Sequence, residues 1–189
     1  MGGATLRLLT IACAVFAGLP ARAGWREAAS THDQNRLARL EEARDRALGE
    51  AGDAGPARAV LASPASGADV FGSWRCRTIK LGGMTPLVVY SWFHCTIRDR
   101  GGEIAFEKTS GSQRMQGTLT RDGEGYVYLG ASWVQGERPH RYSGAGASAG
   151  ASATPDDQIG RLTATQDGAR LELPFPLQES TFDVIELKR

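Results

Sequence analysis

The spacing of apolar positions changes from helical to alternating near residue 64. Between residues 25 and 51, alanine and leucine recur at roughly the spacing of a helix, with charged residues between them. Either Ser30 or Asp33 is placed to cap such a helix, and the glycine-rich run at 52–56 ends it. A short second helix fits residues 57–62. The pattern therefore predicts an N-terminal α-helical segment.

Beyond Pro64, apolar and polar residues alternate with a period of two, which is typical of strands with one buried face. Short turns rich in glycine separate most of these segments, and links of this length join antiparallel neighbours. We expect a mainly β fold: an antiparallel up-and-down β-barrel of about eight strands, preceded by the helical segment. The expected strands cover residues 71–81, 87–98, 103–109, 113–120, 126–135, 159–165, 169–175 and 181–187.

The first 23 residues have the pattern of a secretory signal peptide. Arg7 precedes an apolar run over residues 8–19, which is short for a membrane span, and Ala21-Arg22-Ala23 is a typical cleavage signal. A retained membrane anchor and a lipoprotein attached through Cys13 are the alternatives. We expect a periplasmic or secreted protein that has no stable membrane insertion after cleavage.

The mature chain has the length of one domain. We expect the helical segment over residues 24–64 and the barrel over residues 65–189, with a flexible Gly/Ala/Ser loop at 143–155. After cleavage, 20 Lys and Arg residues stand against 21 Asp and Glu residues, so the net charge is about −1. This balance gives no electrostatic reason to expect a nucleic acid or an anionic lipid as a partner.

Cys76 and Cys95 are the two cysteines that remain after cleavage. In an exported protein, an isolated pair is most simply a disulfide. A metal site would need two more ligands, and His94 is the only histidine nearby. We therefore expect a disulfide, no metal and no cofactor.

The disulfide also suggests a register for the first two strands. Placing Cys76 directly opposite Cys95 puts the turn at residues 82–86, which contain a proline that strands avoid. In this register Lys80, Lys108 and Gln113 point into the barrel near one end. They are our candidate ligand-binding residues. The alternative is that the lysines simply extend from the barrel end into water.

The stretch Lys108-Thr109-Ser110-Gly111 partly resembles two catalytic motifs. A phosphate-binding loop carries its lysine after the glycines and opens a helix, whereas here the lysine comes first and a strand follows. The Lys-Thr-Gly element of penicillin-recognising enzymes accompanies a Ser-x-x-Lys nucleophile, which the mature chain lacks. Glu103 and Glu107 share the outer face of one strand and form no acid/base pair. We therefore expect no catalytic residues and no enzyme.

Three short stretches form a distinctive combination: FGSWRCR at 71–77, FHCTI at 93–97 and FEKTSGSQR at 106–114. Together they resemble a family of exported bacterial proteins known as domain of unknown function number 4893. The resemblance spans nearly all of residues 25–189, with the 143–155 loop as a departure, and it implies export without an assigned activity. Gly72-Ser73-Trp74 is similar, more weakly, to the lipocalin Gly-x-Trp motif, which implies a calycin-like barrel.

Three functional hypotheses follow from these observations. The first is a non-catalytic barrel that binds a small molecule or an envelope component, and it requires a cavity. The second is a protein-partner module such as a periplasmic protease inhibitor, with an exposed apolar edge or a projecting N-terminal segment. The third, an enzyme, requires a cluster of polar residues that includes an acid or a base with a shifted pKa.

Overall fold

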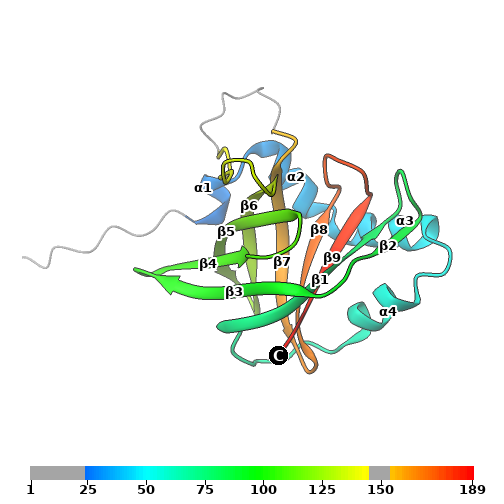
Figure 1. Cartoon of the computed structure of the whole chain (residues 1–189), viewed down its shortest axis with the longest axis horizontal. Coiled ribbons are helices and arrows are strands. Elements are labelled where there is room, and N and C mark those ends of the chain that lie inside the picture. Colours follow the sequence, from blue (N-terminus) through cyan, green and yellow to red (C-terminus); the bar gives the residue numbers. More distant parts are fainter. Residues whose placement is uncertain (1–23, 145–153) are drawn as a thin grey trace, which may run out of the picture.

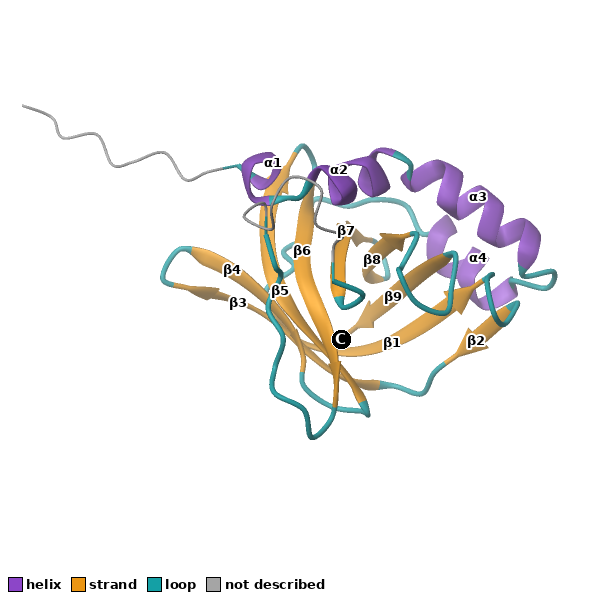
Figure 2. Ribbon diagram, turned by 90° about the horizontal axis from the view of Figure 1, so that it is seen from above, coloured by secondary structure: helices purple, strands orange, loops and turns teal. Residues whose placement is uncertain are grey.

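The computed structural model describes residues 24–144 and 154–189. The expected signal peptide and most of the expected 143–155 loop lie outside these residues. Within the described chain, antiparallel strands form one sheet that closes on itself (Figures 1 and 2). They are β1 (Gly72–Leu81), β2 (Leu87–Val89), β3 (Phe93–Arg100), β4 (Glu103–Lys108), β5 (Gln113–Asp122), β6 (Gly125–Val134), β7 (Asp157–Thr165), β8 (Gly168–Pro174) and β9 (Phe182–Lys188).

The sheet closes through β1, whose two edges pair with different strands. One edge pairs with β9, and the other pairs with β3 near the start of β1 and with β2 near its end. Because β2 and β3 share one position beside β1, the closed barrel has eight strand positions. From β3 to β9, each strand pairs with the next one along the chain. The predicted mainly β, up-and-down barrel is confirmed.

The N-terminal segment is helical, but the single long helix predicted over residues 25–51 is wrong. Ala29 and Ser30 have extended backbone, and the chain kinks again at Arg39. The Ser30 hydroxyl accepts a hydrogen bond from the Asp33 amide at 3.1 Å, so Ser30 is the cap. Within the described residues, the helices are α1 (Trp25–Ala28), α2 (Thr31–Ala38), α3 (Leu40–Glu50) and α4 (Gly55–Ala62).

The helices cover one side of the outer face of the barrel (Figure 2). Trp25 and Leu37 pack with outward-facing residues of β6 and β7, and the break at Ala29 lets both reach the same cluster. Small alanines of α3 and α4 pack against Ile79 of β1 and Val184 of β9. The N-terminal segment therefore lies on the barrel over residues 24–62 instead of projecting from it. No helix among the described residues is both long and apolar enough to cross a membrane.

Large apolar side chains fill one end of the barrel interior. Trp74, Phe106 and Tyr128 belong to this core, and the rings of Phe106 and Tyr128 meet edge to face with centroids 5.6 Å apart. Two glycines make room for Tyr128. A Cβ atom at Gly130 would lie 2.1 Å from the Tyr128 hydroxyl, and one at Gly117 would lie 2.5 Å from the ring. Their small size is therefore a packing requirement.

The Cys76–Cys95 disulfide is present, but the predicted register is wrong by two residues. Cys95 lies opposite Trp74, and Cys76 lies opposite Phe93. The two cysteines are diagonal neighbours with Cα atoms 5.9 Å apart. Residues 90–92 interrupt the second strand, so β2 and β3 do not continue one register. Because side chains alternate with a period of two, a shift of two leaves every residue on its predicted face.

Removing the disulfide should lower stability by a measurable amount. The bond closes a loop with a sequence separation of 19 residues. A Cys76→Ala/Cys95→Ala variant should therefore lose about 3 kcal/mol of unfolding free energy in urea titrations. Reduced wild-type protein is the matched control and should show the same loss. A loss below about 1 kcal/mol would show that the barrel does not depend on the bond.

Candidate ligand-binding site

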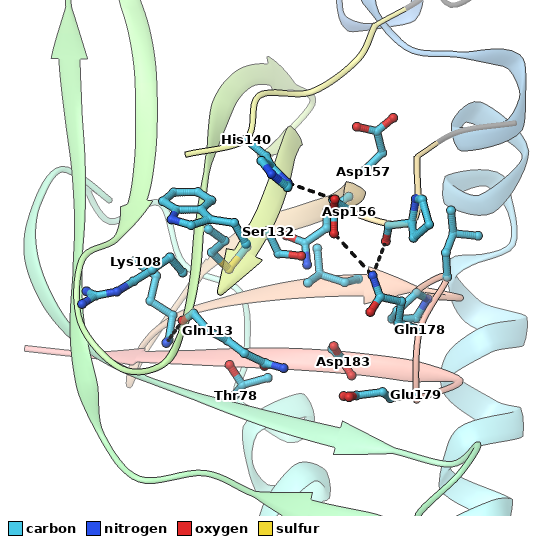
Figure 3. Close-up of a pocket in the computed structure, with 18 of the residues that line it drawn as sticks. Thr78, Lys108, Gln113, Ser132, His140, Asp156, Asp157, Gln178, Glu179 and Asp183 are labelled. Carbon is cyan, nitrogen blue, oxygen red and sulfur yellow. Dashed lines mark hydrogen bonds and ion pairs between the residues drawn. The ribbon is translucent and has the colours of Figure 1, made fainter. Parts of the chain in front are cut away.

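A cavity of about 310 Å³ occupies the other end of the barrel. Figure 3 shows residues that line it. This volume lies at the lower end of the range for ligand pockets, about 300–1,000 Å³. The cavity is walled by inward-facing residues near the strand ends and by the loops of the rim. The inward-facing members include Thr78 and Lys80 of β1, Lys108 of β4, Gln113 and Met115 of β5, Ser132 of β6, Gln158 of β7, Leu173 of β8, and Asp183 and Ile185 of β9.

The structure brings Lys80, Lys108 and Gln113 together at this cavity. Their spatial arrangement follows from strand alternation, which survives the register shift. Their role in binding remains a prediction. The two lysines have different surroundings, which the sequence does not distinguish.

Lys108 is a buried cation without a carboxylate partner among the described residues. It is 6% exposed, and its Nζ donates to the Ser110 carbonyl at 2.9 Å and to the Gln113 carbonyl. Nζ also lies 4.3 Å from the centroid of the Phe93 ring. Burial, together with the positive charge of Arg114, lowers the pKa of Lys108 to about 8. Its charge is therefore only partly compensated.

The turn after β4 explains this geometry. Gly111 has a φ of +87°, which favours glycine. A Cβ atom there would lie 2.8 Å from the Phe93 ring and 2.9 Å from Lys108 Nζ. The Ser110-Gly111-Ser112 turn therefore lets the backbone approach the lysine closely. Gln113 contributes its main-chain carbonyl as well as a side chain, which the sequence analysis did not anticipate.

Lys80 is neutralised by an ion pair. Its Nζ lies 2.5 Å from Oε2 of Glu179, in the loop between β8 and β9. Burial lowers the pKa of Lys80, but the hydrogen bond with Glu179 and the charge of Asp183 outweigh this effect and raise it. The charge of Lys80 is therefore balanced by a carboxylate of the protein, whereas Lys108 has no carboxylate partner among the described residues.

Asp183 adds an acidic group that the sequence analysis missed. It is buried on β9, directly opposite Lys80 in the strand pairing, and its Oδ1 accepts from the Ser180 hydroxyl at 2.6 Å. Burial raises the pKa of Asp183 to about 6, against the opposing effects of Ser180 and Lys80. The sequence did contain a signal for Asp183, because alternation along the 181–187 strand places it on the inner face.

The rim of the cavity contains further polar groups. Asp157 is buried and accepts from the amide and the hydroxyl of Ser143. His140 Nδ1 lies 2.9 Å from Asp156 Oδ2. Oε1 of Gln158 is buried and has no hydrogen-bond partner within residues 24–144 and 154–189. In the same part of the chain, no group of three His, Cys, Asp or Glu residues is arranged to hold a metal ion.

A buried ion pair joins the helices to this rim. Arg36 of α2 donates through Nη1 to Asp33 Oδ1 at 2.8 Å, and through Nε and Nη1 to the carbonyls of Pro174 and Asp157. Tyr142 donates its hydroxyl to Asp33 Oδ2 at 2.6 Å. We call Asp33, Arg36 and Tyr142 the helix clasp. It ties α2 to β8 and to the start of β7, beside the cavity.

Comparison with known proteins identifies the family of this chain. The family model described as Domain of unknown function (DUF4893) matches residues 25–187. The chain belongs to this family. A search of curated proteins and a search of solved structures found no match. The predicted DUF4893 membership is confirmed, whereas the lipocalin resemblance stays a prediction.

The DUF4893 match includes both features described above. It begins at Trp25 and ends at Leu187, so it contains helices α1 to α4, the helix clasp and the described residues that line the cavity. The DUF4893 description itself assigns no activity. Any function for the cavity must therefore be argued from its geometry.

Proposed function

We propose that this protein is an exported, non-catalytic binding protein that holds a small molecule in the barrel-mouth cavity. One observation carries the proposal. Lys108 is 6% exposed, lines the cavity and donates to two carbonyls but to no carboxylate among the described residues. Such a group is destabilising unless something compensates its charge. A ligand in the cavity would supply that compensation.

The uneven filling of the barrel supports the same proposal. Protein interiors are normally packed to high density. Here the Trp74 end of the barrel is packed with apolar side chains, while the Lys108 end keeps a cavity of about 310 Å³ with both polar and apolar walls. This combination of an enclosing scaffold and a few convergent polar groups is typical of small-molecule sites. The export expected from residues 1–23 would place the ligand among the molecules of the cell envelope.

Native mass spectrometry of protein purified from the cells that make it tests this proposal. Wild-type protein should carry a discrete excess mass that denaturation releases. Ser132→Trp places a large ring in the cavity and should abolish the excess mass, since Ser132 lines the cavity. The matched control is Ser91→Trp, at an exposed position outside the cavity.

The outcome is decisive if the variants remain folded, which circular dichroism checks. Excess mass on wild type and Ser91→Trp but not on Ser132→Trp supports binding in the cavity. Equal excess mass on all three proteins places the ligand elsewhere. No excess mass on any of them contradicts the proposal.

Catalysis is the second candidate, and one observation favours it. Lys108 and Asp183 both have shifted pKa values and line the same cavity. Incubation with a small-molecule extract of the same cells separates the two functions. A binding protein depletes a compound by no more than its own molar amount. An enzyme depletes a compound in large excess over the protein, and Lys108→Met should stop that depletion.

A further inference from the structure

Opposite walls of the cavity differ in what they offer a ligand. On one wall, Lys108 is cationic and forms no ion pair with a carboxylate among the described residues. On other strands, Asp183 and Gln158 present acceptor oxygens. Figure 3 shows Lys108 and Asp183 on separate strands around the same space. A bound molecule would therefore meet donors at one end and acceptors at the other.

The Lys108 ammonium carries three N–H groups, and two of them have the Ser110 and Gln113 carbonyls as acceptors. The third has no oxygen or nitrogen acceptor among the described residues, and the Phe93 ring lies 4.3 Å from Nζ. A neutral acceptor would satisfy the third N–H group but would leave the charge uncompensated. A carboxylate or phosphate does both, and hydrogen bonds between charged groups are the stronger kind. Lys108 therefore favours an acidic group.

The acceptor wall favours a donor on the same ligand. Oε1 of Gln158 is buried and has no donor in the described part of the chain. Asp183 is also buried, and its Oδ1 accepts from the Ser180 hydroxyl at 2.6 Å. An unsatisfied buried acceptor such as Gln158 Oε1 is costly, so a hydroxyl or amino group there would be stabilising.

We propose that the ligand is a small organic acid with its carboxylate or phosphate on Lys108 and a hydroxyl or amino group facing Gln158 and Asp183. The inference rests on the proposed function and specifies its ligand class. Pairing with an acid stabilises the charged form of Lys108, so binding should raise the pKa of this residue above about 8. Above that pH, binding should therefore be accompanied by proton uptake.

The composition of the chain makes this measurable by NMR. The sequence contains only three lysines, Lys80, Lys108 and Lys188, so ¹³C-labelled lysine gives three resolvable signals. Methyl-labelled methionine adds Met115, which lines the cavity, and Met84, which is 84% exposed and lies outside it. Met115 reports occupancy whatever the ligand charge, and Lys108 reports its protonation.

The probes are small acids with matched relatives, titrated at pH 8.5. Lactate, serine and 4-hydroxybenzoate are each compared with their primary amides, which lack the charge. Lactate and 4-hydroxybenzoate are also compared with propionate and benzoate, which lack the hydroxyl. We expect at least one of the three acids to shift the Met115 methyl signal and to move the Lys108 signal toward that of the ammonium form. Its matched relatives should bind at least tenfold more weakly. The Met84 and Lys188 signals should not move.

The outcomes separate this inference from the proposed function. If Met115 moves equally with acids and amides, or moves while Lys108 does not, the ligand class is wrong and binding still stands. A retained molecule identified by mass spectrometry without an acidic group also overturns only the ligand class. If no compound moves Met115 and no molecule is retained from the cells, both proposals fail.

Discussion

Replacing Arg36 with methionine is expected to lower the free energy of unfolding by about 3–5 kcal/mol. The side chains of Arg36 and Asp33 are 5% and 0% exposed and are joined at 2.8 Å. Removing the guanidinium leaves a buried carboxylate whose remaining partners include Tyr142 and Ser30. The loss of a single member of a buried ion pair is far more costly than the loss of an exposed pair.

Urea titration of Arg36→Met beside Arg46→Met measures this difference. Arg46 also pairs with a glutamate one helical turn away, but its side chain is 61% exposed. Its replacement should cost no more than about 0.5 kcal/mol. An Asp33→Asn/Arg36→Met double variant should regain part of the loss, because it no longer buries a lone charge. A loss below about 1 kcal/mol for Arg36→Met would show that the helix clasp is not a stabilising element.

Lys108→Met should make the protein more stable at neutral pH while weakening ligand binding. The pKa of Lys108 is about 8 in the folded protein, against 10.5 for an ordinary lysine. Below pH 8, Lys108 is protonated in both the folded and the unfolded protein, and only the folded protein carries the cost of burying this charge. Methionine removes that cost but cannot donate to the two carbonyls. We therefore expect a net gain of about 1–2 kcal/mol.

The pH dependence gives a signature that a packing effect would not reproduce. Between pH 8 and 10.5 the unfolded wild-type chain binds more protons at this position than the folded chain. Wild-type stability should therefore rise over this interval relative to Lys108→Met, and the gap between the two should close. The control is Lys188→Met, whose side chain is 47% exposed and should leave the profile unchanged. A variant less stable than wild type at pH 7 would contradict our description of Lys108.

A gain in stability together with a loss of ligand binding is the result expected for a residue that serves function. A residue retained for stability should not be improved by methionine, whereas binding sites commonly keep groups that destabilise the empty protein. In the same variant, ligand affinity should fall by about 2–5 kcal/mol, the usual cost of removing one partner of a buried charge pair.

The alternation of side chains explains why the sequence predicts so much of the barrel. Strand alternation placed Trp74, Phe106 and Lys108 on the inner face, and the structure agrees. A period of two is insensitive to the register shift at Cys76 and Cys95. The alternation pattern does not reveal the break at residues 90–92, and this break sets the actual register.

The helices show where local pattern stops being informative. The helices pack on β1, β6, β7 and β9, which the local pattern of the N-terminal segment does not specify. Ile79 and Val184 belong to one apolar cluster on the outer face and Leu129 belongs to another, and only the closed barrel shows which helices cover each. Trp92 lies against Arg75 and Arg77, with guanidinium carbons 5.0 and 4.8 Å from its ring centroid.

The candidate site was predictable in part for a related reason. Residues at strand ends share a mouth if the strands and their directions are right, which brought Lys80, Lys108 and Gln113 together. The partner of Lys80 comes from the loop between β8 and β9, where Glu179 adopts a φ of +66°. Loop conformation of this kind is not encoded in alternation, so the difference between a paired and an unpaired lysine required the structure.

A crystal structure of the protein purified from the cells that make it, without added ligand, tests the central claim most directly. We expect density for an ordered small molecule in the barrel-mouth cavity, within hydrogen-bonding distance of Lys108 Nζ and on the inner side of Ser132. A cavity that holds only water, or one that rim side chains have filled, in a protein that also carries no excess mass, would contradict the claim.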